Sequence, residues 1–135
     1  MSEDPHDSTD KDDIYKDVNS ICERVQQQLG CLHGRESFYK KAIAAELVAK
    51  GYNAKVECAV PVEYTTVGKV NISVGNVYID IACDTFFIEL KNVKNILATH
   101  INQCKLYSKL TGKKGYLINF STMLNEEIQI KIVGG

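Results

Sequence analysis

The sequence predicts one α/β domain in which helices flank a mixed β-sheet. Apolar residues recur at three- and four-residue spacing in the first third of the chain, as in amphipathic helices, and alternate in later segments, as in strands. A further helical stretch separates the strand-like segments, and this order of elements is typical of α/β domains. With 135 residues, the chain is long enough for one modest core without disulfides or metals to hold it together.

The amino-terminal segment and the first two helices come before all the strands. Residues 1–12 are acidic and lack apolar periodicity, so they are predicted to be a disordered tail, and residues 13–135 are predicted to form the single domain. A helix is expected from about Asp12 to a stop at Gly30, and a second one over about residues 36–50.

The strands follow, with one more helix among them. The segment 54–66 alternates but contains Pro61, which indicates an edge strand or a bend. Gly75-Asn76 separates two alternating runs and predicts a hairpin turn. On α-helical spacing, Leu97, Ile101, Cys104 and Leu110 are expected to face inward, and Leu106 is also assigned to the core. Strands are predicted over residues 54–66, 70–74, 77–82, 86–93, 115–120 and 128–133, with a helix over about residues 95–110.

Cysteine usage and hydropathy limit the possible classes. The five cysteines are scattered, with no CxxC pair and no histidine at ligand spacing, which argues against a zinc site, an iron–sulfur site and a disulfide framework. No signal peptide or long apolar run is evident. We therefore expect a soluble intracellular protein, cytoplasmic or nuclear, with no membrane partner.

Charge is unevenly distributed along the chain. The net charge of −1 combines an acidic amino-terminal end with a basic remainder. Residues 90–125 contain no Asp or Glu but carry Lys91, Lys94, Lys105, Lys109, Lys113 and Lys114. Such a surface suits a polyanion such as nucleic acid, although simple solubility explains the same pattern.

The strand-like segment 86–93 contains two charges that an interior strand would not be expected to hold. Glu89 and Lys91 share one face of an otherwise apolar strand. If the chain turns at residues 83–85, antiparallel partners have positions that sum to about 168, and Asp80 then falls within one residue of Glu89. Two carboxylates this close repel each other unless a cation joins them, and Mg²⁺ or Mn²⁺ prefers such oxygen ligands. The alternative is an ion pair on an exposed sheet face.

These residues resemble a known nuclease signature. Asp80 followed by Glu89-Leu90-Lys91 is similar to the D…(D/E)xK motif of the PD-(D/E)XK nuclease superfamily, with Ile79 in place of the proline. Gln103 and Tyr107 are similar to the QxxxY motif of one branch. Across about residues 25–133 the chain resembles the small GxxExxY family, through the segments 36–47, 61–64, 88–93, 100–107 and 115–120. His33 stands where that family has a glycine, and the stretch between Tyr64 and Asp80 is longer than expected.

The resemblance implies a restriction-endonuclease-like fold and a role for each matched residue. Asp80, Glu89 and the backbone carbonyl of Leu90 would bind Mg²⁺ or Mn²⁺, Lys91 would assist catalysis, and Glu36 would reach the metal or complete a second site. Gln103 and Tyr107 would bind a phosphate or orient Lys91. The remaining lysines, Lys94, Lys105, Lys109, Lys113 and Lys114, would contact backbone phosphates.

The predicted function is that of a metal-dependent nuclease, a hydrolase acting on nucleic acid, DNA in preference to RNA, without strong intrinsic sequence specificity. A homodimer or a partner protein could supply specificity. The alternative is a catalytically silent nuclease fold that serves as a nucleic-acid-binding module or as a structural component of a virion or nucleoprotein.

Overall fold

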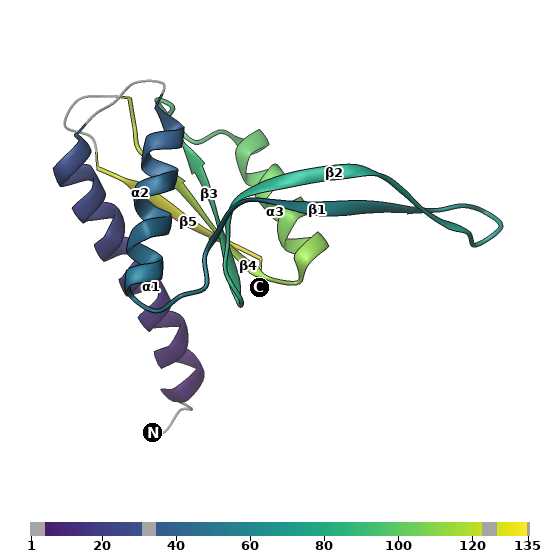
Figure 1. Cartoon of the computed structure of the whole chain (residues 1–135), viewed down its shortest axis with the longest axis horizontal. Coiled ribbons are helices and arrows are strands. Elements are labelled where there is room, and N and C mark those ends of the chain that lie inside the picture. Colours follow the sequence, from purple (N-terminus) through teal and green to yellow (C-terminus); the bar gives the residue numbers. More distant parts are fainter. Residues whose placement is uncertain (1–4, 31–34, 123–126, 135) are drawn as a thin grey trace.

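The computed structural model describes residues 5–30, 35–122 and 127–134, and these form three layers (Figure 1). Helices α1 and α2 cover one face of a five-stranded sheet, and α3 covers the other face. The predicted α/β class with a mixed sheet is therefore confirmed. The elements are α1 (Pro5–Leu29), α2 (Glu36–Ala49), β1 (Lys55–Thr65), β2 (Asn71–Ala82), β3 (Phe86–Lys91), α3 (Ala98–Thr111), β4 (Lys114–Asn119) and β5 (Gln129–Val133).

Strand β3 lies at the centre of the sheet and is buried on both faces. Phe86, Ile88 and Leu90 belong to the core cluster under α1 and α2, and Phe87 belongs to the cluster under α3. Because side chains alternate faces along a strand, both clusters draw on this one segment. Glu89 is the only charged residue among the first five positions of the strand, all of which are buried.

The sheet is mixed because of a single parallel pair. The strands lie in the order β1-β2-β3-β4-β5, and β3 pairs in parallel with β4 after the crossover through α3. The remaining pairs are antiparallel. Among the described strands, β1 lies at one edge, and Pro61 is exposed there, as the sequence predicted for a residue that has no backbone N–H to donate.

The hairpin between β1 and β2 corrects one prediction. Gly75-Asn76 does not form a turn but lies within the continuous strand β2, paired with β1. The chain turns instead between Thr66 and Val70, where the Thr66 N–H donates to the Val70 carbonyl at 2.9 Å and Lys69 has a φ of 66°. The prediction was wrong because Gly75, with a φ of 151°, lies beside a β-bulge and not at the tip.

The first helix begins earlier than predicted. It extends from Pro5, so residues 5–12 of the tail that was predicted to be disordered belong to the helix, while residues 1–4 of that tail lie outside the described residues. Proline suits the first turn of a helix because no partner is needed there for its missing N–H. No glycine or proline interrupts the sequence between Pro5 and Gly30.

Among the described residues, no helix has the length and apolarity needed to cross a bilayer.

Helix α3 presents a narrower buried face than predicted. Its buried residues are Cys104, Tyr107 and Ser108, and these lie on one side at three- and four-residue spacing. Leu97 and Leu106 were expected in the core, but 57% and 46% of their respective surfaces are exposed. Leu106 is two residues from Cys104 and therefore points away from the sheet, whereas Leu97 precedes the first turn.

Candidate active site

Asp80 and Glu89 lie side by side where β2 and β3 separate. Regular pairing ends at Ile81 and Ile88, whose positions sum to 169 against the predicted value of about 168. Beyond that point the carboxylates take the place of backbone carbonyls. The Asp80 N–H donates to Glu89 Oε1 at 2.9 Å, and the Leu90 N–H donates to Asp80 Oδ2 at 2.8 Å. Each carboxylate is thus fixed by the backbone of the opposite strand.

Glu89 is the electrostatically strained member of this pair. Its side chain lies in the core, and the residue is only 4% exposed. Burial, and then the neighbouring Asp80 carboxylate, raise the pKa of Glu89 to about 8, while the Asp80 N–H, Lys91 and Lys40 act in the opposite direction. A cation shared with Asp80 would reverse both of the effects that raise this pKa.

Lys40 is part of the site although it was not among the predicted site residues. It reaches over from α2, and its Nζ lies 3.2 Å from Asp80 Oδ1 and 3.9 Å from Glu57 Oε2. The Lys40 and Asp80 side chains are 14% and 18% exposed, respectively. Lys40 is therefore a largely buried cation that already neutralises part of the carboxylate pair.

Glu57 contributes a third carboxylate at the rim of the site. The pairing between β1 and β2 skips this residue, which stands across from Asp80 between two regular pairs. Its φ of 52° places it in the left-handed region, which is uncommon for a residue other than glycine. Backbone strain of this kind concentrates at functional sites. The side chain is 70% exposed and contacts the site through Lys40.

Glu36, which the family resemblance selected, begins α2 and is half-buried. It precedes Lys40 by four residues, so the two side chains share one face of the helix. Within the described part of the chain, no three or more His, Cys, Asp or Glu side chains come together in a group that could hold a metal ion. Glu36 is therefore not gathered with Asp80 and Glu89 into such a group.

The backbone around Lys91 is held firmly by β4. The Lys91 carbonyl accepts a hydrogen bond from the Phe120 N–H at 2.9 Å. Asn119, which is fully buried, accepts from the Val93 N–H at 3.0 Å and donates to the Val93 carbonyl at 2.9 Å. No sequence pattern had selected Asn119. Its bidentate clamp fixes the segment that follows Lys91, and so fixes the direction in which that lysine leaves the strand.

Two residues of α3 approach the carboxylates from the other side of the sheet. Tyr107 is 6% exposed, and its ring packs edge-on to Phe87. Burial raises the pKa of the Tyr107 hydroxyl, and so do Glu89 and Asp80, against a hydrogen bond from Gln103. Gln103 itself is exposed. Gln103 and Tyr107 therefore line the approach to Glu89 as a pair, with the amide on the solvent side.

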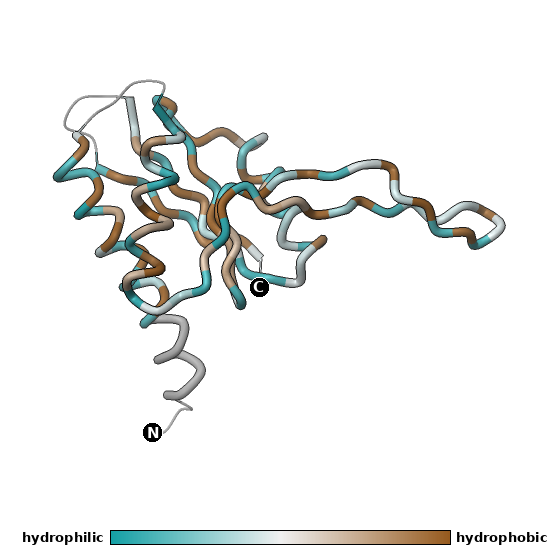
Figure 2. Tube along the Cα trace, viewed as in Figure 1, coloured by the Kyte–Doolittle hydropathy of each residue, from teal (hydrophilic) through white to brown (hydrophobic). Residues whose placement is uncertain are grey.

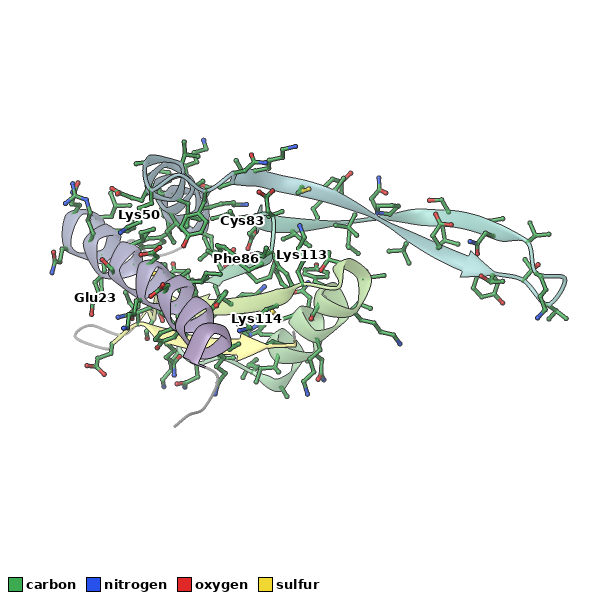
Figure 3. All side chains as sticks on the ribbon, turned by 90° about the horizontal axis from the view of Figure 1, so that it is seen from below. Glu23, Lys50, Cys83, Phe86, Lys113 and Lys114 are labelled. Carbon is green, nitrogen blue, oxygen red and sulfur yellow. The ribbon has the colours of Figure 1, made fainter. Side chains whose placement is uncertain are left out.

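The predicted lysine surface is divided between two ends of the sheet. Lys94 follows β3 at the same end as Lys91, whereas Lys114 pairs with Phe86 at the start of β3. At about 3.3 Å per residue along a strand, these ends are roughly 17 Å apart. Lys113 donates to the Cys83 carbonyl at 2.6 Å, near Phe86 at the start of β3 (Figure 3). Lys105 and Lys109 lie exposed along α3 between the two ends.

The donor set suits a hard divalent cation. Asp80 and Glu89 supply carboxylate oxygens, the ligands that Mg²⁺ and Mn²⁺ prefer, and the raised pKa of Glu89 indicates a buried carboxyl that resists ionisation unless a cation stabilises its charged form. Since the described residues offer no third carboxylate in direct reach, the remaining ligands would be the Leu90 carbonyl, water and a substrate phosphate. This is the usual pattern for Mg²⁺, which is commonly bound by one or two carboxylates.

Comparison with known proteins gives one match. A family model described as the PD-(D/E)XK nuclease superfamily matches residues 12–131, which is most of the chain and includes every residue of the candidate site. A search of curated proteins and a search of solved structures gave no significant match.

Proposed function

The chain belongs to the PD-(D/E)XK nuclease superfamily, and we propose that it is a metal-dependent phosphodiesterase that cleaves nucleic acid, DNA in preference to RNA. The observation that carries this proposal is the interlocked pair of Asp80 and Glu89. A buried carboxylate with a raised pKa beside a second carboxylate is costly in a folded protein unless it serves a cation. Lys91 follows two residues along the same strand face.

Each residue has a defined role in this proposal. Asp80, Glu89 and the Leu90 carbonyl hold Mg²⁺ or Mn²⁺, which when bound polarises the scissile phosphate and lowers the pKa of a water molecule. Lys91 offsets the negative charge that builds on the phosphate and assists the attack of water. The Phe120 N–H and the Asn119 clamp fix the backbone at Lys91 and Val93, from which the lysine side chain extends. Glu36, half-buried and one turn before Lys40, assists through water at the rim.

Binding of nucleic acid rests on the lysines and not on a base-reading element. Lys94, Lys105 and Lys109 contact phosphates near the carboxylates and along α3, and such contacts position the duplex without reading its sequence. Lys113 and Lys114 contact the backbone at the other end of β3, roughly 17 Å from Lys91, a span of about five base pairs. Sequence specificity, where it exists, comes from a partner protein or from DNA shape.

We further infer that the chain belongs to the GxxExxY branch, which carries a QxxxY motif. Tyr39, which corresponds to the tyrosine of the first motif, is 1% exposed, stacks on Phe120 at 4.2 Å and donates to the Gly30 carbonyl. Gln103 and Tyr107, which correspond to the second motif, share one face of α3, and Glu89 is among the groups that raise the pKa of Tyr107. Both motifs thus lie next to residues of the candidate site.

One observation favours a second function, that of a nuclease fold used only to bind nucleic acid. Lys40 already neutralises Asp80 at 3.2 Å, so the carboxylate pair is partly satisfied by the protein itself. A site that had lost its metal would need such an internal cation to stay folded.

A cleavage assay separates the two functions. Wild-type protein is expected to cut DNA with Mg²⁺ or Mn²⁺, and Lys91→Ala is expected to lower the rate by about 10²–10⁴-fold, because a positioned electrostatic or acid–base group is lost. DNA affinity should change little in Lys91→Ala, since one phosphate contact among several is removed. The readouts are single-turnover cleavage and fluorescence anisotropy with the same labelled DNA.

The matched control is Lys109→Ala, which removes an exposed lysine of α3 that has a role in DNA binding but none in the chemical step. It should weaken DNA binding at least as much as Lys91→Ala does and leave cleavage at saturating DNA unchanged. If the wild type binds single- or double-stranded DNA but cuts neither with either metal, the second function replaces the first.

A further inference from the structure

The distal part of the hairpin formed by β1 and β2 projects away from the three-layered domain (Figure 1). We call residues 62–76 the arm. All of its residues are exposed except Val62 and Thr66, which are half-buried. In Figure 3 the side chains of this hairpin extend into open space beyond the edge of the domain. The arm therefore lacks the support of the helical layers.

The arm is amphipathic although no core lies beneath it. Tyr64 pairs with Ile72, while the preceding residues Glu63 and Ser73 pair with each other. Cross-strand partners share one face of a ribbon and their neighbours share the opposite face. One face therefore carries apolar side chains and the other carries polar ones, and the hydropathy colouring alternates accordingly along the arm (Figure 2).

The apolar side chains of the arm are large and poorly covered. Two-stranded ribbons without a covered face are at best marginally stable in water, and contiguous exposed apolar patches mark interaction surfaces. The exposed fraction of these apolar residues is between 46% and 100%: 57% for Tyr64, 100% for Val67, 58% for Val70, 46% for Ile72 and 60% for Val74. One face of the arm therefore carries apolar side chains of the kind that usually lie on the buried face of a sheet, although here they are exposed.

We propose that the apolar face of the arm packs against the same face of a second copy of this chain, which forms a two-fold dimer. Glu63 and Lys69 are the only charged residues of the arm, so its net charge is zero. A neutral face does not attract a polyanion, and two identical neutral faces do not repel each other. A self-complementary apolar patch is the requirement for a two-fold interface.

The open edge of β1 favours packing through the face over pairing through the edge. Pro61, at the base of the arm, is exposed and has no N–H, so it interrupts any strand added to that edge. The faces carry no such obstacle. The two arms therefore meet as packed ribbons and not as one extended sheet.

The available area indicates a weak dimer. If a fully exposed side chain of this kind presents the 60–120 Å² implied by its transfer energy, the five apolar side chains at their exposed fractions present roughly 300 Å² per copy. Two copies then bury on the order of 600 Å² of apolar surface, about half of the roughly 1,200 Å² of a stable interface, and polar neighbours would supply the rim. Because area alone does not fix affinity, the proposal is tested over a concentration range on the order of 1–100 μM.

Sedimentation velocity of the full chain across this concentration range tests the proposal. Wild type should pass from monomer to dimer, and Ile72→Arg should weaken the dimer at least about tenfold, because each interface would then hold two facing arginines. The matched control is Asn71→Arg, which adds the same charge to the preceding residue, on the polar face, and should leave the dimer intact. The milder variant Ile72→Ser should weaken it less, without any charge effect.

A fluorescent variant gives a second readout that does not depend on disrupting the arm. The chain contains no tryptophan, so Tyr64→Trp introduces a single reporter in the apolar face. Its emission should shift to shorter wavelength as concentration rises, in parallel with the sedimentation data.

Three outcomes overturn the proposal. The first is a wild type that remains monomeric throughout the range, together with a Tyr64→Trp emission that does not move with concentration. The second is a dimer that Asn71→Arg disrupts as strongly as Ile72→Arg does. The third is a monomer whose affinity for DNA falls in Ile72→Arg and not in Asn71→Arg, since nucleic acid and not a second copy would then cover the arm.

Discussion

The carboxylate site and the arm depart from the usual distribution of residues in opposite directions. At the site, β3 buries Glu89 inside an apolar strand, and at the arm, Tyr64 and Ile72 are exposed on a ribbon that projects into solvent. Each arrangement is unfavourable for the isolated chain, because buried charge and exposed apolar surface both raise its free energy. Each becomes favourable once a partner is added, a cation in one case and an apolar surface in the other.

The comparison also shows where the sheet changes character. The pairing between β1 and β2 skips Glu57, opposite Asp80. A few residues further along the two strands, Val60, Val77 and Ile79 still belong to the cluster under α3. Beyond them the arm begins, and it projects from the domain with no helix over it (Figure 1). The candidate active site therefore lies in the supported part of the sheet, a short distance before the arm.

The largest change in the free energy of unfolding is expected when an isoleucine is shortened in the core and not in the arm. Ile88 is fully buried in β3, whereas Ile72 is 46% exposed in the arm. Ile88→Ala should lower the free energy of unfolding by about 2–5 kcal/mol, because it leaves a cavity in a packed core. Ile72→Ala should change it by less than about 0.5 kcal/mol in dilute solution. Urea unfolding at low protein concentration measures both, and equal losses would show that the arm is part of the folded core.

The core region could be predicted from sequence because local patterns determine it. The apolar run of β3 followed from the alternation of its residues, and the register that brings Asp80 to Glu89 followed from one short turn. The paired residues Ile81 and Ile88 have positions that sum to 169, one more than the expected 168. The parallel pairing of β3 with β4 across α3 fits the predicted mixed sheet. The assignment to the PD-(D/E)XK nuclease superfamily followed from the same few residues.

The remaining features depend on backbone geometry that sequence patterns do not encode. Gly75 lies next to a bulge and not in a turn, so one strand was read as two. The positive φ of Glu57 and the reach of Lys40 across to Asp80 arise from tertiary packing. One signal was available, because helical spacing places Lys40 one turn after Glu36, which the family resemblance had selected. No comparable signal pointed to Asn119, because the sequence does not show which backbone groups a buried amide in an apolar strand will hydrogen-bond.

The second expected effect comes from the buried Glu89 carboxyl and depends on pH. Burial and the Asp80 carboxylate raise the pKa of Glu89 from 4.5 to about 8. Between these values the folded state holds a proton that the unfolded chain has released, so the stability contributed by this group is lost as pH rises. Glu89→Gln cannot ionise and should be more stable than wild type above about pH 8, by up to about 5 kcal/mol, since each unit of the pKa shift corresponds to about 1.4 kcal/mol.

This stability difference should shrink as the pH is lowered and vanish below about pH 4.5. Urea unfolding of both proteins in the presence of a chelator, at several pH values, measures it. The exposed Glu63→Gln change in the arm is the matched control and should give no such pH dependence. Two parallel stability curves for wild type and Glu89→Gln would mean that Glu89 is not strained in the folded protein.

The smallest expected effect concerns the internal cation that the site already possesses. Lys40 Nζ lies 3.2 Å from Asp80 Oδ1, and like charges at one carboxylate repel, so a bound divalent cation must displace or weaken this ion pair. Lys40→Met keeps most of the aliphatic stem and removes the charge. The variant should be less stable without metal, because Asp80 loses its partner, yet it should bind Mn²⁺ up to about tenfold more tightly, which adds about 1.4 kcal/mol to the stabilisation by metal at saturation.

Thermal unfolding over a series of Mn²⁺ concentrations measures this shift. Lys41→Met, an exposed neighbour on the same helix, should follow wild type, and Asp80→Asn should abolish the metal-dependent stabilisation altogether. A weaker Mn²⁺ response in Lys40→Met would mean that Lys40 supports the metal site and does not compete with it. No Mn²⁺ response in any variant, wild type included, would assign the buried carboxylates to Lys40 alone, and the site would then be one that needs no added cation at all.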